Sequence, residues 1–225
     1  MEPNKRRVRF YIDGFNFYYG IKRSVAADRR WGNAYWIDVV KLCSGFIGPD
    51  EVLDKVFYFT ASPLDSGQSS RQSAFLNANK EINKDVFEVV RGKYLAKQIE
   101  CPNCRFSISR PEEKKTDVNI SVRMIADCME KSTDKVVLVS ADTDLIPPLE
   151  LIRSSFSEIK IKVMFPPSNF SHDLSTTMAA WKSKVTLMER NLVRFEESVM
   201  PDTVAEGKYS IPPEWKRKQV PPIAT

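Results

Sequence analysis

The stretch Val136-Val137-Leu138-Val139-Ser140-Ala141-Asp142-Thr143-Asp144 decides the fold class. Its first four residues are all apolar, without polar alternation. Such a run predicts a strand that is buried on both faces, as in a parallel sheet. Two aspartates follow at the point where the strand should end. Because ligands of open parallel sheets bind beyond the carboxyl ends of the strands, the stretch also predicts which edge of the sheet holds a site.

Strand-like and helix-like segments alternate on both sides of this stretch. Strands are expected at Val8–Ile12, Val52–Thr60, Phe87–Tyr94 and Ile159–Phe165. Helices are expected at Phe15–Val25, Ile37–Phe46, Gln68–Asn83 and Leu145–Ser154, and less regular elements at Ser175–Trp181 and Leu187–Phe195. Strands separated by helices predict βαβ units, and therefore an α/β protein with a mainly parallel central sheet covered by helices on both sides.

The clearest helical pattern lies at Asp117–Glu130, just before the decisive strand. Its apolar residues recur at helical spacing, at Val118, Val122, Ile125 and Met129. This periodicity predicts that these four residues form the buried face of the helix. Thr116 is the expected N-cap, because a threonine hydroxyl can accept a hydrogen bond from a free amide of the first turn.

Composition narrows the class of protein. The chain has 225 residues, of which 42% are hydrophobic, so it can bury a sizeable core. The net charge of +5 permits a polyanionic partner without requiring one. No apolar run approaches the roughly 20 residues that cross a bilayer, and no signal-peptide pattern is recognisable. We therefore expect a cytoplasmic protein without membrane contact, in which Cys43 and Cys128 are reduced thiols of the core.

Four carboxylates fall at the predicted strand ends. Asp13 follows the strand Val8–Ile12, Asp142 and Asp144 follow the decisive strand, and Asp117 opens the helix that leads into it. Each alone could be a turn residue or an N-cap. Gathered at one edge, however, four carboxylates repel one another unless cations lie between them. Hard oxygen ligands suit Mg²⁺ or Mn²⁺, so the pattern predicts a metal site.

Asn16 belongs to the same segment as Asp13. In Asp13-Gly14-Phe15-Asn16, the glycine is expected to allow a sharp turn of the backbone. Asn16 then lies about one helical turn from Asp13, where its amide can bind a carboxylate or a phosphate oxygen. The alternative is that Asn16 is only a residue of the helix start.

Three blocks of sequence resemble the signature blocks of the NYN domain, in the LabA-like branch of the PIN-like nuclease superfamily. They are Tyr11-Ile12-Asp13-Gly14-Phe15-Asn16, Lys115-Thr116-Asp117-Val118-Asn119 and Ser140-Ala141-Asp142-Thr143-Asp144-Leu145. The resemblance covers roughly residues 6–190. It implies a Rossmann-like, three-layer α/β sandwich, which we expect to span residues 1–195. From the residue pattern we expect a hairpin insertion at 99–112, and from the recurring prolines a partly extended C-terminal tail at 196–225.

The resemblance also implies an activity, which is endonucleolytic cleavage, usually of RNA rather than DNA. Asp13, Asp117, Asp142 and Asp144 take the metal-site roles, and Asn16, Ser140 and Thr143 become supporting residues. Metal-assisted hydrolysis should leave a 5′-phosphate and a 3′-hydroxyl. The single histidine, His172, argues against an acid–base mechanism with two imidazoles.

Three other functions are weaker alternatives. A haloacid-dehalogenase-like phosphatase needs a second aspartate at the position of Phe15. A dinucleotide-binding protein needs a glycine-rich loop after the first strand, which the sequence lacks. A catalytically idle nucleic-acid-binding or regulatory module on the same fold remains open, although such a binder gains nothing from four carboxylates that face a polyanion.

The segment Ile99–Arg110 is expected to form a small hairpin that carries Cys101 and Cys104. This CxxC resembles a zinc knuckle, but a structural zinc site needs about four ligands. A homodimer could supply two further thiolates. Without one, a tight turn with two free thiols is the favoured interpretation, and Zn²⁺ the less favoured one.

Substrate contacts are expected near the first helix, where Tyr18, Tyr19, Lys22 and Arg23 combine aromatic surface with positive charge. This combination suits single-stranded nucleic acid. Arg29-Arg30-Trp31 repeats it. Lys115, close to Asp117, could bind a phosphate, which positions a strand without reading its sequence.

Overall fold

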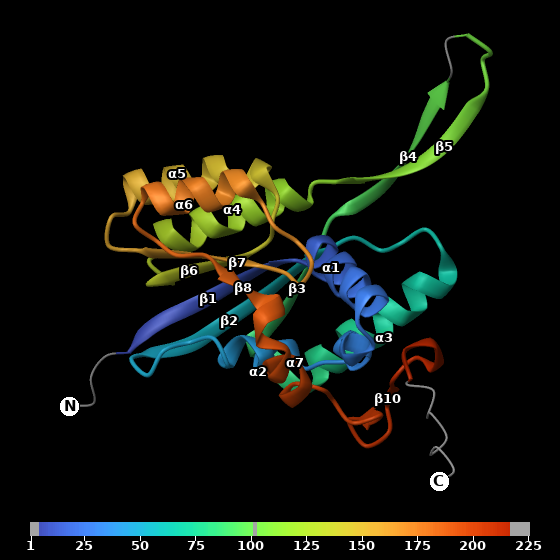
Figure 1. Cartoon of the computed structure of the whole chain (residues 1–225), viewed down its shortest axis with the longest axis horizontal. Helices are drawn as coiled ribbons and strands as arrows, with labels where there is room; N and C mark the ends of the chain where they lie inside the picture. Colours follow the sequence, from blue (N-terminus) through green and yellow to red (C-terminus); the bar gives the residue numbers. More distant parts are fainter. Residues whose placement is uncertain (1–4, 101–102, 217–225) are drawn as a thin grey trace.

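A parallel six-stranded sheet forms the centre of the computed structural model, which describes residues 5–100 and 103–216, and only the backbone of residues 94–100 and 108–114 (Figure 1). The strand order is β3-β2-β1-β6-β7-β8, and every neighbouring pair is parallel. The strands are β1 (Arg6–Asp13), β2 (Glu51–Thr60), β3 (Phe87–Arg91), β6 (Lys135–Val139), β7 (Lys160–Phe165) and β8 (Thr186–Leu187).

Helices cover both faces of the sheet, which confirms the predicted α/β sandwich (Figure 1). One face carries α1 (Gly14–Ala27), α2 (Val39–Ser44), α3 (Ser66–Asn83) and α7 (Leu192–Glu197). The other carries α4 (Thr116–Met129), α5 (Ile146–Ser155) and α6 (His172–Ala180). Four short 3₁₀ turns, η1 (Arg29–Tyr35), η2 (Lys84–Val86), η3 (Thr143–Leu145) and η4 (Met188–Asn191), connect these elements.

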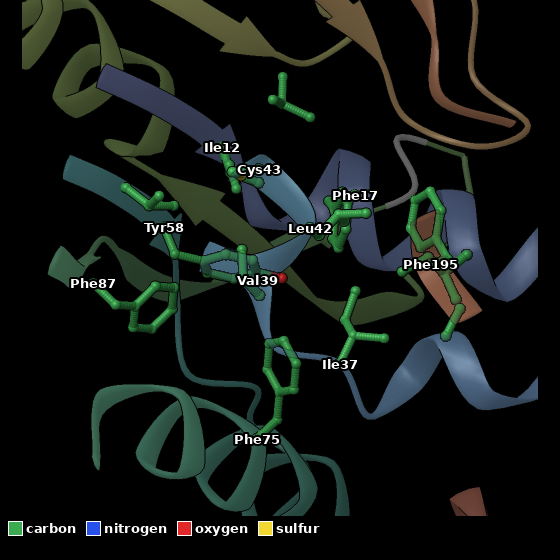
Figure 2. Packing of buried hydrophobic residues seen from close by; sticks show 14 of the residues in the cluster. Ile12, Phe17, Ile37, Val39, Leu42, Cys43, Tyr58, Phe75, Phe87 and Phe195 are labelled. Atoms are coloured by element: carbon green, nitrogen blue, oxygen red, sulfur yellow. The ribbon is translucent and has the colours of Figure 1, made fainter. Parts of the chain in front are cut away.

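Strand β6 shows why this sheet must be covered on both sides. Val137 and Val139 belong to the core under α1, whereas Val136 and Leu138 belong to the core under α4. All four are at most 1% exposed, which confirms the predicted double burial. We call the core under α1 the first core. Figure 2 shows it, where side chains from β1, β2, α1, α2 and α3 meet.

The predicted end of the third strand is wrong. Phe87–Tyr94 is divided at Gly92 into β3 and β4 (Lys93–Glu100), and β4 pairs with β5 (Ser107–Lys114) in a separate two-stranded sheet. The neighbouring strand β2 ends at Thr60, opposite Arg91, so no partner is available for a longer β3. The hairpin is therefore longer than the predicted Ile99–Arg110, and it projects from the body of the molecule (Figure 1).

Helix α4 exists where it was predicted, but the predicted buried face is wrong. Val118, Val122 and Met129 are 63%, 60% and 68% exposed. The face toward the sheet instead carries Ile120, Met124, Asp127 and Cys128. A buried aspartate interrupts this apolar stripe, and the periodicity therefore favoured the wrong side of the helix.

The C-terminal segment packs on the first core. Met200, Val204 and Ile211 are buried there, around the short pair β9 (Thr203–Val204) and β10 (Tyr209–Ser210). The turn η5 (Pro213–Trp215) places Trp215 against Tyr35, with ring centroids 5.4 Å apart. The domain boundary at residue 195 stays a prediction. Among the described helices, none is long and apolar enough to cross a membrane.

Candidate metal centre

Three aspartates from distant parts of the chain meet at the carboxyl edge of the sheet. Asp13 ends β1, Asp117 lies in the first turn of α4, and Asp142 follows β6. One carboxylate oxygen from each lies within 4.8 Å of the others. Asp13 is buried, and the other two are partly exposed. The β1–β6 pairing explains this meeting, because adjacent parallel strands end at the same edge.

Asp13 is held rigidly by four hydrogen bonds. Its Oδ1 accepts from the backbone amides of Phe15 and Asn16, at 3.1 and 3.0 Å, so Asp13 is also the N-cap of α1. Its Oδ2 accepts from Asn16 Nδ2 at 2.7 Å and from Ser140 Oγ at 2.8 Å. Asn16 and Ser140 therefore orient this carboxylate.

Asp142 is tied to the same network. Ser140 Oγ, which donates to Asp13, accepts from the Asp142 amide at 3.1 Å. Asp142 Oδ1 in turn accepts from the Asp144 amide at 3.0 Å and caps η3. One hydroxyl thus links the ends of β1 and β6, and the loop that carries Asp142 has a defined conformation.

Asp144 is not brought into the cluster of three. Its side chain is exposed, as is that of Thr143. Asp144 is nevertheless near enough to contribute to the raised pKa of Asp117. Its predicted role as a ligand stays a prediction.

The start of α4 differs from the predicted one, and the difference sets the position of Asp117. Lys115, not Thr116, is the N-cap, and its φ of 79° places it in the left-handed region. Thr116 is buried in the first turn instead. The left-handed residue turns the chain from β5 into α4, so that Asp117 lies at the sheet edge while Lys115 is exposed beside it.

The structural role of Gly14 also differs from the expected sharp turn of the backbone. Gly207 is the one glycine with positive φ among the described residues, so Gly14 provides no left-handed turn. A Cβ atom on Gly14 would instead lie 2.6 Å from the carbonyl oxygen of Phe59 and would also collide with the Tyr58 ring. The glycine allows α1 to begin directly against β2.

The residues expected to contact the substrate differ in exposure. Tyr19 is exposed, and the Lys22 ammonium lies 5.8 Å from the centre of its ring. Arg23 donates to the side chain of Asn169 and to the carbonyl of Ser168. Trp31 is buried against Phe195 and offers no stacking surface, so the repeat at Arg29-Arg30-Trp31 was wrong.

Asn169 was missed by the sequence analysis. It lies in the loop after β7, and its Nδ2 donates to the carbonyl oxygen of Asn16 at 2.7 Å. This contact joins the end of a third sheet strand, β7, to the ends of β1 and β6 at the site. The available signal was the sequence Pro166-Pro167-Ser168-Asn169 directly after a predicted strand, because polar residues at that edge are candidates wherever a parallel strand ends.

None of the described cysteines belongs to the aspartate cluster. Cys43 and Cys128 are free, buried thiols, as predicted, and Cys104 is free and exposed. Cys101 lies outside the described residues, so the zinc alternative stays a prediction. The single histidine, His172, is exposed at the start of α6.

An aromatic pocket of about 70 Å³ lies between α1, η1, α3 and η5 and begins at Gly14, next to Asp13 in the chain. Gly14, the residue after Asp13, is part of its wall. The rings that line it include Tyr18, Tyr35, Tyr58, Phe75 and Trp215.

Residues 7–178 match the family described as "NYN domain", which is most of the chain. The chain belongs to the NYN domain family. NYN domains are typically metal-dependent nucleases, and membership implies a nucleic-acid substrate. The three-aspartate cluster of this NYN domain is consistent with divalent-metal binding, since three carboxylates present a hard, anionic set of oxygen donors.

Two further proteins are similar to this NYN domain. One is a 6-hydroxy-3-succinoylpyridine 3-monooxygenase from Pseudomonas putida, 27% identical over 95% of this chain and 76% of that protein. The other is a crystal structure of a protein of unknown function from Vibrio parahaemolyticus, with a TM-score of 0.51 and 18% identity over 84% of this chain and 96% of that chain. The second likeness supports the fold alone.

The carboxylates of this NYN domain perturb one another. Burial, followed by the charges of Asp142, Asp13 and Asp144, raises the pKa of Asp117 to about 6. Burial also raises the pKa of Asp13, although the hydrogen bonds from Asn16 and Ser140 oppose that shift. A cation would relieve both effects, because it replaces repulsion by attraction.

We expect the affinity for Mn²⁺ to fall as the pH drops through about 6, because a proton then competes with the cation for Asp117. Titrating Mn²⁺ at pH 7.5 and pH 5, with free Mn²⁺ followed by electron paramagnetic resonance, measures this change. Asp117→Asn should bind more weakly and show a flatter pH profile. Equal affinity of the parent at both pH values would contradict the assignment of Asp117 as a ligand.

Proposed function

We propose that this NYN domain is a divalent-metal-dependent endonuclease of the LabA-like branch, which hydrolyses RNA and leaves 5′-phosphate and 3′-hydroxyl ends. The observation that carries the proposal is the meeting of Asp13, Asp117 and Asp142 within 4.8 Å at the carboxyl edge of the sheet. Asp144 is included as an outer ligand or a positioning residue, on the same exposed rim.

The residues around the cluster have distinct tasks. Asp13 is fixed by Asn16 and Ser140, so the position of its carboxylate is set before a ligand binds. Asp117 and Asp142 supply the partly exposed side of the site, where a phosphate could approach. A bound Mg²⁺ or Mn²⁺ would neutralise these carboxylates, polarise the scissile phosphate and lower the pKa of an attacking water. Lys115, exposed beside Asp117, would hold an adjacent phosphate.

The idle binding module has less support than the nuclease. A protein that only binds a polyanion gains affinity from cations and loses it from anions. Here three carboxylates are gathered at the site, and burial together with their mutual repulsion raises the pKa of Asp117. A metal-dependent reaction explains such a cluster, whereas binding alone does not.

Labelled single-stranded RNA and DNA of one sequence, incubated with the protein in Mn²⁺ or in a chelator, test the proposal. We expect cleavage of RNA in Mn²⁺ and none in the chelator, with less cleavage of DNA. The ends of the products should accept a 3′-ligated adaptor without further treatment. Metal-independent cleavage, or no cleavage of either polymer in Mn²⁺, would refute the proposed reaction.

Lys115→Ala should weaken RNA binding and reduce the dependence of log Kd on log salt by about one phosphate contact, which is a slope change of roughly 0.7 for a single strand. Binding at several salt concentrations in the chelator measures the slope. Lys84→Ala is the matched control, because Lys84 is an exposed lysine in η2, before β3 and thus at the opposite edge of the sheet. An unchanged slope in Lys115→Ala would exclude the phosphate contact.

A second candidate is ring hydroxylation of a small hydroxypyridine, as named for the relative from Pseudomonas putida. The aromatic pocket favours it, since a flat ring fits between aromatic walls. The name of that relative places the oxygen at ring carbon 3, which carries the succinoyl group, so a C–O bond forms there as the ring–acyl bond breaks. One oxygen atom of O₂ enters the ring and the other leaves as water, a reduced nicotinamide supplies two electrons, and a water molecule takes up the acyl group as a carboxylic acid. Oxygen uptake with 6-hydroxy-3-succinoylpyridine and a reduced nicotinamide tests this candidate. Uptake that requires both compounds would support it, and uptake at the background rate would exclude it for that substrate.

A further inference from the structure

The aromatic pocket has the size of a single ring system and begins beside the metal site. Its 70 Å³ is the space open to the centres of water-sized spheres, and one water needs about 10–15 Å³ on that measure. The pocket therefore holds the equivalent of roughly five to seven waters. Gly14 and Phe15, which follow Asp13 directly, line one side of it.

Its walls are ring faces in mutual contact. Tyr35 stacks on Trp215 with an angle of 14° between the rings, and Tyr18 lies 5.9 Å from Tyr35. Phe75 makes edge-to-face contacts with two further rings of the wall. Its ring centroid lies 6.5 Å from that of Trp215 and 6.0 Å from that of Tyr58. Such walls favour a flat aromatic ligand, because each face can stack on a further ring.

One hydrogen-bond acceptor on the pocket wall has no partner among the described residues. Gln72 Nε2 donates to Thr60 Oγ1 at 2.9 Å and to the carbonyl oxygen of Ala61 at 3.1 Å. Because a carbonyl oxygen can only accept, this contact fixes which end of the amide is the nitrogen. Gln72 Oε1 is therefore the other end, and it is buried without a hydrogen bond. Gln72 belongs to the pocket wall, so a ligand N–H group that reached this oxygen would satisfy it.

The outer wall of the pocket comes from the C-terminal segment. Arg71, also on the wall, pairs with Glu214 at 2.9 Å. This ion pair holds η5, and with it Trp215, over the pocket. The pocket is thus built by segments more than 200 residues apart in the chain, from Gly14 to Trp215.

We infer that this pocket takes one unpaired nucleobase of the substrate strand, next to the phosphate that a cation bound by Asp13, Asp117 and Asp142 would hold. The inference rests on the proposed nuclease function and names its substrate class, which is single-stranded nucleic acid. A nucleobase is flat, it stacks, and it carries an N–H group for Gln72 Oε1. In a duplex the bases are stacked and paired, so none is free to enter.

Equilibrium binding of a short, fluorescently labelled single-stranded RNA tests the inference in a chelator, where the result does not depend on cleavage. The same RNA is prepared with one abasic nucleotide at each position in turn. We expect one position at which loss of the base weakens binding by roughly fivefold to 150-fold, the range for one stacked base. The duplex of the same sequence should bind more weakly than the single strand.

Trp215→Ala and Gln72→Met identify the pocket as the place where that base binds. In both variants the intact RNA should bind more weakly, and the sensitive abasic position should no longer differ from the others. Trp181→Ala is the matched control, because Trp181 lies beside Arg153 of α5, on the opposite face of the sheet. Melting temperatures of all variants show whether folding is retained.

The outcomes separate this inference from the proposed function. If the parent cleaves RNA in Mn²⁺ but the abasic series is flat, the pocket inference fails and the nuclease stands. If the sensitive position exists without cleavage, the nuclease fails and the pocket stands. If a free hydroxypyridine binds and Trp215→Ala abolishes that binding while the abasic series is flat, the pocket serves a small molecule and the inference is overturned.

Discussion

Asp117→Asn is expected to reduce RNA cleavage in Mn²⁺ by about a hundredfold or more, because the site loses one of the charges that would hold the cation. The asparagine keeps the shape of the side chain, so the fold should be retained. In metal-free protein at neutral pH, the melting temperature should rise, since the raised pKa of Asp117 reports an unfavourable charge. A carboxyl with a raised pKa destabilises the fold above that pKa, and this effect disappears as the pH falls from about 6 toward 4.

The melting temperature of Asp117→Asn should therefore exceed that of the parent at pH 7.5 and approach it at pH 4. Asp85→Asn is the matched control, because Asp85 is exposed in η2, just before β3 and at the far edge of the sheet. It should leave both cleavage and Mn²⁺ binding unchanged. If Asp117→Asn cleaves as fast as the parent, the three-aspartate cluster is not the catalytic centre.

Asp127→Ala is expected to lower the free energy of unfolding by about 3–5 kcal/mol, the effect of removing one partner from a buried ion pair. The Asp127 side chain lies on the buried face of α4 and is fully buried. It accepts from Tyr11 Oη at 2.6 Å and pairs with Arg9 at 2.8 Å and with Arg123 at 3.0 Å. Without this carboxylate, a phenol and two guanidinium groups lose their shared acceptor.

For a chain of this length the loss corresponds to a decrease of roughly 6–20 °C in melting temperature. Urea denaturation followed by circular dichroism measures the free energy itself. Asp50→Ala is the matched control, because the Arg6–Asp50 pair is largely exposed and such pairs contribute about 0–1 kcal/mol. Equal stability of Asp127→Ala and the parent would show that the network contributes nothing net.

The two aspartates of α4 have opposite relations to the fold. Asp127 is surrounded by donors, which compensate its burial. Asp117 is partly buried among other carboxylates, which do not. A group that is unfavourable for stability and is nevertheless held in place is more readily explained by function than by folding.

The strand ends were predictable from local pattern. The apolar run Val136–Val139 indicated burial on both faces, and Asp13 and Asp142 followed directly after strands. Adjacent parallel strands end at one edge of a sheet, so the meeting of these two residues follows from strand positions alone. The short last strand β8, with two residues, carried no comparable signal.

The orientation of α4 was not predictable in the same way. Val118, Val122 and Met129 have the spacing of a buried face, yet they are exposed. The buried face includes Asp127, and a sequence pattern counts a buried aspartate as polar. Only the tertiary contacts with Arg9 and Tyr11 show that its charge is compensated.

The fold class and the edge at which Asp13, Asp117 and Asp142 lie could be predicted from the sequence, because both depend on periodicity and on the ends of strands. The packing of distant segments sets which carboxylates come within 4.8 Å of one another, and it leaves Asp144 outside that group. It also built the aromatic pocket, from Gly14 at one end of the chain and Trp215 at the other. The physical reason is that periodicity is a property of neighbouring residues, whereas a distance between side chains depends on how distant segments pack.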